Sequence, residues 1–260
     1  MTWILLRGLT REARHWGAFT GQLEQALGDR VITLDLPGNG SLHAEASPTS
    51  IEAITERARR QLRETGAMGL QPPFNLLGMS LGGMVAADWA QRYPAEVALL
   101  ALVNTSMRPF SGPTERLRIR NWPALARLAF CWNDAARVEA SIHGLTCNRN
   151  ARRVDDVALW MRIRQTAPVS TGSALRQLLA AARFTAPSKA PACPVLVLSS
   201  EQDQLVDPVC SERLAHAWRA PHRRHRWAGH DLPHDDGNWL ALQVARWVRE
   251  GANWPSGVIR

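Results

Sequence analysis

The sequence lacks any long hydrophobic run. No uninterrupted apolar stretch approaches the roughly 18–20 residues that span a bilayer, so no transmembrane helix is predicted. The N-terminal stretch from Met1 to Gly8 also lacks a basic region followed by a long apolar one, so no secretory signal is expected. These absences favour a soluble protein, which we expect to be cytoplasmic.

Cysteine is scarce and carries no metal or redox spacing. The four residues, Cys131, Cys147, Cys193 and Cys210, form no C-x-x-C pair, which leaves zinc-ribbon and redox readings without support. In an intracellular protein of this size we expect free, mostly buried thiols. No cofactor and no metal is predicted.

One short region is nonetheless dense in metal-ligand types. His230 and Asp231 are followed by His234, Asp235 and Asp236. No H-E-x-x-H motif is present, and Pro233 should interrupt any helix that would align the two histidines. A metal site here is therefore a minor alternative.

Charge of one sign is in excess, with 31 basic against 23 acidic residues and a net charge of +8. Basic clusters lie at residues 116–120, 152–153 and 222–226. Such an excess can mark a nucleic-acid surface, but no aromatic-interleaved groove or nucleic-acid motif accompanies it. We favour an ordinary solvated surface and predict no nucleic-acid partner, while attraction of an anionic substrate stays open.

The rest of the composition is that of a globular domain. At 260 residues with 45% hydrophobic residues, the chain is long enough to bury a sizeable core. Six short apolar runs are read as strands: Thr2–Leu6, Val31–Asp35, Phe74–Met79, Val97–Val103, Pro194–Ser199 and the weaker, basic His222–Trp227. Segments of helical period lie between them: Trp16–Leu27, Ile51–Glu64, Leu81–Arg92, Val209–Trp218 and Trp239–Glu250. This alternation predicts an α/β fold, with a mostly parallel sheet of about six strands and helices on both faces.

The alternation breaks in the middle of the chain. Between about Met107 and Pro191 the pattern is helical throughout, and no convincing strand follows any of these helices. We therefore expect residues 1–106 and 191–260 to form the core, and residues 107–190 an inserted helical cap subdomain over the strand ends.

A strand–turn–helix signature surrounds Ser80. Gly78-Met79-Ser80-Leu81-Gly82-Gly83 follows a predicted strand and opens a predicted helix, the setting of a nucleophile elbow. The sharp turn lifts the serine hydroxyl above the sheet edge, and glycines are needed where a Cβ would collide. Chance occurrence of G-x-S-x-G is common, but the strand before and the helix after make this signal strong.

A serine hydroxyl needs a base, and the base needs an orienting carboxylate. His230 follows the last predicted strand, with His234 as its competitor. Asp203 lies in the loop after the fifth strand, where Glu201 and Asp207 are rivals. The order Ser80, Asp203, His230 is the one that this elbow architecture requires.

Two backbone amides are candidates to stabilise an oxyanion. The N–H of Leu81 follows the nucleophile directly, and the N–H of Leu9 lies in the loop after the first strand. The acid position after the fourth strand holds Asn104. An amide cannot act there as an anion, which favours Asp203.

These segments resemble the α/β-hydrolase superfamily, in particular its small capped serine esterases. The resemblance covers roughly residues 2–106 and 191–249. It rests on Leu5-Leu6-Arg7-Gly8, on Asp35-Leu36-Pro37-Gly38-Asn39-Gly40-Ser41, on the elbow, on the Asp203–Pro208 loop and on Gly229-His230. Ser80 separates the chain from dehalogenases and epoxide hydrolases of this architecture, which use aspartate as the nucleophile.

The chain departs from the family pattern in two places. Arg7-Gly8 stands where members usually carry His-Gly, so Arg7 either contacts an anionic substrate or, as we favour, alters loop packing. The sequence also begins at the first core strand, without the usual preceding β-hairpin, which implies a six-stranded sheet.

Three functions follow, in order of preference. The first is hydrolysis of a small carboxylic ester through an acyl-enzyme on Ser80. The second is a non-hydrolytic lyase like the menaquinone-pathway synthase, which uses the same triad on an anionic substrate and would require basic cap residues around Ser80. The third is a non-catalytic binding protein. Aromatic residues of the cap are candidates for the substrate pocket, although packing within the cap is at least as good a reading: Trp122, Phe130, Trp132 and Trp160.

Overall fold

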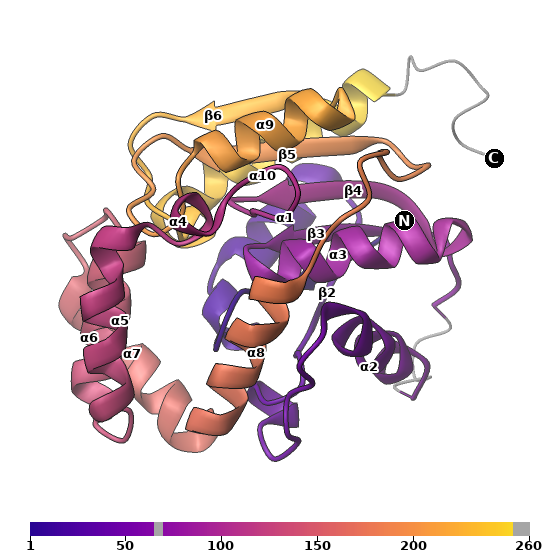
Figure 1. The fold of residues 1–260 in the computed structure, drawn as a ribbon. Helices are drawn as coiled ribbons and strands as arrows, with labels where there is room; N and C mark the ends of the chain where they lie inside the picture. The colour runs from indigo at the N-terminus through magenta and orange to yellow at the C-terminus, as the bar shows by residue number, and fades with distance from the viewer. Residues whose placement is uncertain (65–69, 252–260) are drawn as a thin grey trace.

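A computed structural model describes residues 1–64 and 70–251. Six strands form one sheet in the order β2-β1-β3-β4-β5-β6, and every neighbouring pair is parallel. The strands are β1 (Thr2–Leu6), β2 (Arg30–Leu34), β3 (Phe74–Met79), β4 (Val97–Val103), β5 (Val195–Ser200) and β6 (His222–His225). Helices cover both faces (Figure 1). The predicted α/β architecture is confirmed.

Alternation along each strand divides the core into two layers. In β1, Ile4 and Leu6 pack with one buried cluster, whereas Trp3 and Leu5 pack with the other. The first layer is covered by α2 (Ile51–Glu64), α3 (Leu81–Arg92) and α9 (Val209–Trp218), and the second by α1 (Phe19–Leu27) and α10 (Leu232–Gly251). Burial on both faces explains why the central strands are almost continuously apolar.

The weakest predicted strand forms at the edge of the sheet. β6 is short and basic, and it pairs only with β5. An edge strand is covered less completely than a central one, so arginines at positions 223 and 224 are tolerated.

Two helix boundaries differ from expectation. The predicted helix Trp16–Leu27 is divided into a 3-10 turn (Ala13–Trp16) and α1, because Gly17 adopts a φ of 53° between them. The predicted helix Trp239–Glu250 lies within α10 (Leu232–Gly251), whose first turn begins at Leu232 and is separated from the rest by a kink at Asp236, where φ is −151°. Pro233 lies in its first turn, where the missing N–H has no intrahelical acceptor to lose, so this proline starts the helix rather than interrupting it.

Between β4 and β5 the chain is helical, as expected. This helical segment, residues 107–190, contains α4 (Pro113–Arg116), α5 (Trp122–Phe130), α6 (Ala135–Thr146), α7 (Arg153–Thr166) and α8 (Thr171–Arg183). In Figure 1, α5, α6 and α7 form a group beside the sheet, and α8 leads back toward it. The chain leaves the sheet after β4 and returns to it before β5 at nearly the same place. There the amide of Ala186 donates to the carbonyl of Arg108 at 2.8 Å.

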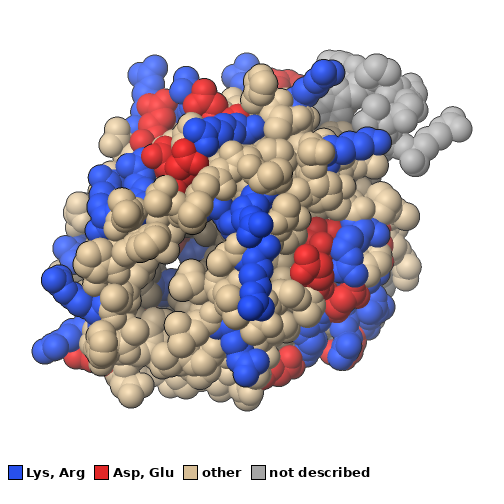
Figure 2. Space-filling model, in the orientation of Figure 1, with Lys and Arg blue, Asp and Glu red and all other residues tan. Residues whose placement is uncertain are grey.

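Two further features of the protein are the lengths of its helices and the distribution of charged side chains on one face. None of the helices within residues 1–64 and 70–251 is long and apolar enough to cross a membrane. On the face shown in Figure 2, basic side chains lie in separate groups, several of them beside acidic ones. The ion pairs of the described residues include Arg59 with Glu96 and Arg213 with Glu115.

Candidate active site

Ser80 occupies a strained turn at the carboxyl end of β3. Its backbone adopts φ 54° and ψ −120°, a conformation that residues with a Cβ rarely take. Its amide donates to the carbonyl of Val103 at 2.9 Å, and its carbonyl accepts from the Thr105 hydroxyl at 2.8 Å. These bonds fix the serine between β3 and α3, as the elbow motif predicts.

The glycines of the motif are required by close backbone approach. A Cβ on Gly78 would overlap the backbone of Gly82 and Gly83. One on Gly82 would overlap the carbonyls of Leu6 and Arg7, at the end of β1. The elbow and the loop after β1 therefore pack backbone against backbone, beside Ser80.

His230 and Asp203 form a buried pair. Nδ1 of His230 lies 2.7 Å from Oδ2 of Asp203, and both side chains are at most 5% exposed. The other carboxylate oxygen of Asp203 accepts from the amides of Leu205 and Val206. The contact holds the ring with Nδ1 toward the acid, so that Nε2 is the nitrogen left to act on a neighbour.

The alternative histidine and the two alternative acids have other partners. His234 contacts Asp156, with 3.0 Å between Nε2 and the carboxylate oxygen. Glu201 is 40% exposed at its side chain, and the amide of Val209 donates to Asp207 at 3.1 Å, which caps α9. Neither acid has a hydrogen bond or ion pair with His230 among the described residues.

Asn104 has a positioning role that sequence reasoning missed. Its side-chain amide donates to the carbonyl of His230 at 2.8 Å and to the Ser200 hydroxyl at 3.0 Å, while its carbonyl accepts from the Ser200 amide. It therefore ties the end of β5 to the loop that carries His230. Its φ of 45° suits asparagine, which tolerates this region better than most residues. The sequence did show that Asn104 directly follows the fourth strand, and this position was the one sign of its role.

Ser80 and His230 both line one cavity of about 190 Å³. Gly8 and Leu9 line it as well, so the loop after β1 lies beside the serine. Leu81 is the first residue of α3, a position whose N–H has no intrahelical acceptor. The loop after β1 and the first residue of α3 therefore both lie close to Ser80.

The other wall of this cavity is apolar and comes largely from the helical segment. Figure 2 shows a hollow between α5 and α8 on this face. The lining residues of the segment are mainly aliphatic: Leu117, Leu125, Leu128, Ala129, Ile142, Leu145, Ala174, Leu175 and Leu178, together with Trp132, Thr146 and Thr171.

The expectation for aromatic pocket residues was wrong in three of four positions. Only Trp132 lines the cavity. Phe130 is 92% exposed, Trp122 is 46% exposed, and Trp160 is buried against His15, His143 and His234. Helical period identified the helices, but it did not orient their aromatic faces.

The two arginines of the cavity wall are both neutralised. Arg7 makes two hydrogen bonds to Asp231, at 3.0 and 2.6 Å, and stacks over the ring of Trp16. Burial acts to raise the pKa of Asp231, but the charge and hydrogen bonds of Arg7 outweigh it and lower the pKa to about 2. Arg11 pairs with the buried Glu139 at 2.6 Å. Arg7 therefore packs the loop rather than offering a free charge.

The thiols are not rival nucleophiles. All four cysteines are free, as expected, and Cys147 and Cys210 are buried. Burial raises the pKa of the Cys193 and Cys210 thiols to about 11 and raises that of Cys147 further. At neutral pH these groups are protonated and unreactive.

Comparison with known proteins gives a consistent family. The profile described as "Alpha/beta hydrolase family" matches residues 3–243. The "Putative carbamate hydrolase RutD" of Variovorax paradoxus is 32% identical over 82% of this chain and 77% of its own. The pimeloyl-acyl-carrier-protein methyl ester esterase of Aromatoleum aromaticum is 37% identical over 40% of this chain and 36% of its own.

Solved structures give the same fold at lower identity. A thermophilic esterase from Thermogutta terrifontis superposes with a TM-score of 0.75 and 22% identity, covering 96% of this chain and 90% of that one. An enol-lactonase from Burkholderia xenovorans also reaches 0.75, with 19% identity over 95% and 91% of the two chains. At these identities the likeness concerns the fold alone.

Proposed function

Since this chain belongs to the alpha/beta hydrolase family, we propose that it is a serine hydrolase that cleaves a small, largely apolar carboxylic ester. Ser80 is the nucleophile, His230 the general base and Asp203 its orienting acid. The amides of Leu9 and Leu81 are the oxyanion donors. The helical segment, residues 107–190, serves as a cap that shapes the substrate pocket.

One observation carries this proposal. Ser80 projects from a strained turn into the same cavity as His230, whose Nδ1 lies 2.7 Å from the buried carboxylate of Asp203. A strained turn is retained where the surrounding structure enforces it, and nucleophiles are a common reason. A purely structural role would need neither the strain nor the buried pair.

In the first half-reaction, Ser80 Oγ attacks the ester carbonyl carbon as His230 Nε2 accepts the hydroxyl proton. The carbonyl oxygen becomes an oxyanion, which the two amides stabilise. When the tetrahedral intermediate collapses, the bond to the alcohol oxygen breaks and His230 returns its proton to that oxygen. The products are a free alcohol and an acyl ester on Ser80.

In the second half-reaction, water takes the place of the alcohol. His230 accepts a proton from the water as its oxygen attacks the acyl carbon, and then returns that proton to Ser80 Oγ as the acyl–serine bond breaks. The net change is one water consumed and one carboxylic acid released. Asp203 stays ionised throughout, and it stabilises the imidazolium that forms in each half.

The cavity wall supports an apolar substrate. Leu125 and Leu128 of α5 and Leu175 and Leu178 of α8 line it. Aliphatic walls stabilise an acyl or alcohol chain by removing it from water, at about 25 cal/mol for each Å² of apolar surface. The carbamate named for the first relative is a smaller and more polar group, so these walls favour the ester.

The lyase alternative loses its support. It required basic side chains of the cap to gather around Ser80, and the two arginines that line the cavity are Arg7 and Arg11. Each is paired with a buried carboxylate, Asp231 and Glu139 respectively. An anionic substrate would have to break one of these pairs.

The test is turnover of a nitrophenyl ester series by the wild-type protein and by Ser80→Ala. We expect hydrolysis of esters with short to medium acyl chains, and loss of kcat by about 10⁶-fold in the variant. Ser199→Ala is the matched control, since Ser199 is a buried serine of the same sheet whose hydroxyl contacts His222. It should retain wild-type kcat.

A fluorophosphonate probe separates the remaining readings. Labelling at Ser80 without ester turnover would favour non-hydrolytic use of the triad. No labelling of folded protein would favour a non-catalytic binding protein. Equal turnover by the wild type and Ser80→Ala would overturn the mechanism.

A further inference from the structure

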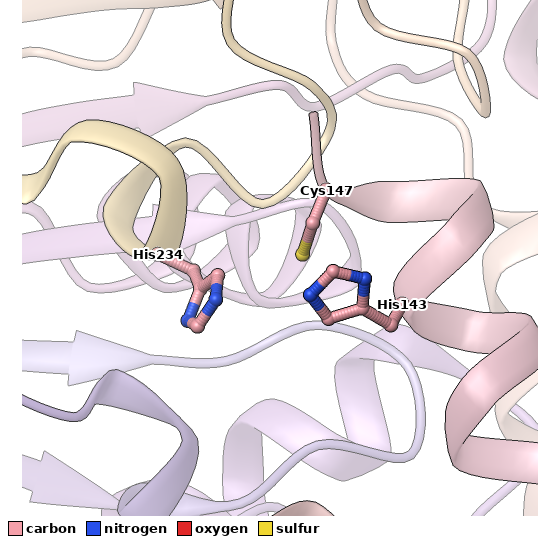
Figure 3. Close-up of side chains that lie close together, drawn as sticks. All are labelled: His143, Cys147 and His234. Atoms are coloured by element: carbon pink, nitrogen blue, oxygen red, sulfur yellow. The ribbon is translucent and has the colours of Figure 1, made fainter. Parts of the chain in front are cut away.

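A second cluster of reactive side chains lies outside the cavity. His143 and Cys147 stand at the C-terminal end of α6, and His234 lies in the first turn of α10. One ligand atom from each lies within 4.8 Å of the others. The two imidazole rings lie side by side at an interplanar angle of 83°, and the sulfur of Cys147 points toward the gap between them (Figure 3).

His143 lacks the partners that a buried imidazole needs. Its side chain is fully buried, and neither ring nitrogen has a hydrogen bond within the described parts of the chain. A carboxylate oxygen of Asp156 lies 3.7 Å from Nε2, beyond hydrogen-bond range. A buried polar group without a hydrogen-bond partner is destabilising. Both ring nitrogens of His143 are therefore available to a further group in this space.

The spacing of the cluster is that of a metal site. His143 and Cys147 are four residues apart, and the amide of Cys147 donates to the carbonyl of His143 at 2.8 Å. Cys147 is the C-cap of α6, with an extended backbone (φ −117°, ψ 139°), so the chain turns out of the helix at the cysteine. This H-x-x-x-C spacing was visible in the sequence, but the third member is distant along the chain.

We propose that His143, Cys147 and His234 bind a divalent transition-metal ion of the zinc type. Imidazole and thiolate are the ligands that Zn²⁺ prefers. In a tetrahedral site the ligand atoms stand about 3.5 Å apart. The atoms of this cluster lie within 4.8 Å of one another, so binding would draw the side chains closer to the ion.

Asp156 completes the site from α7. Its carboxylate lies 3.0 Å from Nε2 of His234, so Nδ1 is the nitrogen that this ring offers to the ion. A carboxylate that holds the far nitrogen of a ligand histidine is a frequent outer partner of zinc. Asp231 and Asp235 add negative charge near Cys147, and they oppose the positive charges of Arg153 and Arg11.

The bound ion would clamp the helical segment onto the core. His143 belongs to α6, Cys147 follows directly after its last residue, and His234 belongs to α10, four residues after His230. The same contact already carries hydrogen bonds from the amide of Asp231 to the carbonyl of Thr146 and from Asn148 to Asp235. The site is buried and separate from Ser80, so its role is structural rather than catalytic.

The test uses the full chain, stripped with a chelator and titrated with Co²⁺, whose complexes with thiolates absorb strongly. We expect one cobalt per chain with a thiolate-to-cobalt absorption band, displaced by Zn²⁺, and a Tm that rises with added zinc. Cys147→Ser should abolish the band and weaken binding by more than about 100-fold, the upper range for loss of an outer partner.

Controls make the outcome specific. Cys193→Ser removes a half-buried thiol outside the cluster and should leave the cobalt band unchanged. His234→Gln, at a side chain that is 19% exposed, tests the site should Cys147→Ser fail to fold. Ser80→Ala should bind cobalt as the wild type does, so this result is independent of the esterase proposal. No stoichiometric complex, or a band that survives Cys147→Ser, would overturn the site.

Discussion

The core and the helical segment are built by different rules. In the core, aliphatic side chains form two continuous clusters on either side of the sheet. In residues 107–190 the separate buried cluster is small, comprising Cys147, Trp160 and Ile163 with Ile142 beside it. Polar contacts join this part to the core, including Arg11 with Glu139 and His234 with Asp156.

This difference assigns the core and the helical segment different roles in the proposed function: the core carries the reaction, and the helical segment selects the substrate. Packing in the core fixes Ser80 and Asp203, and the loop that carries His230 is held in addition by the bond from the Asp231 amide to the carbonyl of Thr146, so the chemistry tolerates little change at these places. Several leucines of the helical segment line the cavity, and Leu159 and Leu179 are exposed outside it. Changes in it should alter which substrate fits rather than whether the reaction occurs. The predictions below test this division from the largest expected effect to the smallest.

Asp203→Asn should have the largest effect. The amide can still accept from Leu205 and Val206, but it favours the wrong tautomer of His230 and cannot stabilise the imidazolium. We expect kcat to fall by about 10⁴-fold with the fold retained. Steady-state kinetics with the best nitrophenyl ester measures it. Glu201→Gln, a nearby exposed acid, is the control and should change kcat by no more than about twofold. A loss confined to KM would contradict the role given to Asp203.

Arg7→Met should chiefly affect stability. It leaves Asp231 buried without its cation, and breaking a buried pair in this way costs about 3–5 kcal/mol. Urea unfolding of the variant measures the loss. The control is Arg213→Met, which removes an exposed pair with Glu115 and should cost at most about 1 kcal/mol. If both variants lost the same free energy of unfolding, the buried Arg7–Asp231 pair would contribute no more to stability than an exposed pair.

The same pair predicts a pH dependence. The pKa of Asp231 is lowered from 3.8 to about 2, so its folded form binds a proton less readily than its unfolded form. The resulting stability is present above pH 3.8 and is lost as the pH falls toward 2. Thermal melts of the wild type should show this loss, and Arg7→Met should reduce it. If Arg7→Met kept the full pH dependence of stability, that dependence would have to come from other carboxyl groups.

These core features were only partly visible in the sequence. Strand β3, helix α3 and the elbow were predicted with their observed bounds, because apolar runs, glycine spacing and helical period are local signals. The partner of Arg7 was not predictable, since Asp231 lies 224 positions away. The same holds for Asn104, whose contacts lie at the end of β5 and in the loop that carries His230, 96 and 126 residues further on.

Leu178→Trp should change selectivity in the helical segment. The larger side chain would fill part of the cavity and exclude longer acyl chains, at about 1–3 kcal/mol per methylene displaced, or 10–200-fold in kcat/KM. Short esters should keep their wild-type kcat. Leu179→Trp is the matched control, since Leu179 follows on the same helix but does not line the cavity. A uniform loss across all chain lengths would place Leu178 in the chemistry instead.

Phe130→Ser should have the smallest effect. Phe130 is 92% exposed and lies outside the cavity, although the sequence suggested a pocket role for it. We expect a stability change within about 0.5 kcal/mol and an unaltered ester profile. Differential scanning fluorimetry and the ester series measure both. A changed acyl preference would show that the cavity extends to the tip of α5.

The helical segment was predicted as a whole and not in its details. Its helical period was clear, but the orientation of each helix depends on contacts with distant parts of the chain. For that reason Trp160, expected at the pocket, packs against histidines from three other elements. The His143, Cys147 and His234 cluster was hidden for the same reason.

The contact of Ala186 with Arg108 has an evolutionary consequence. Because the chain leaves the sheet and rejoins it at one point, the 77 positions between these two residues can lengthen, shorten or be exchanged without displacing β4 or β5. The entropy of closing such an insertion grows only slowly with its length. During evolution this region can therefore change, and with it the substrates that fit, while the fold of the core stays the same.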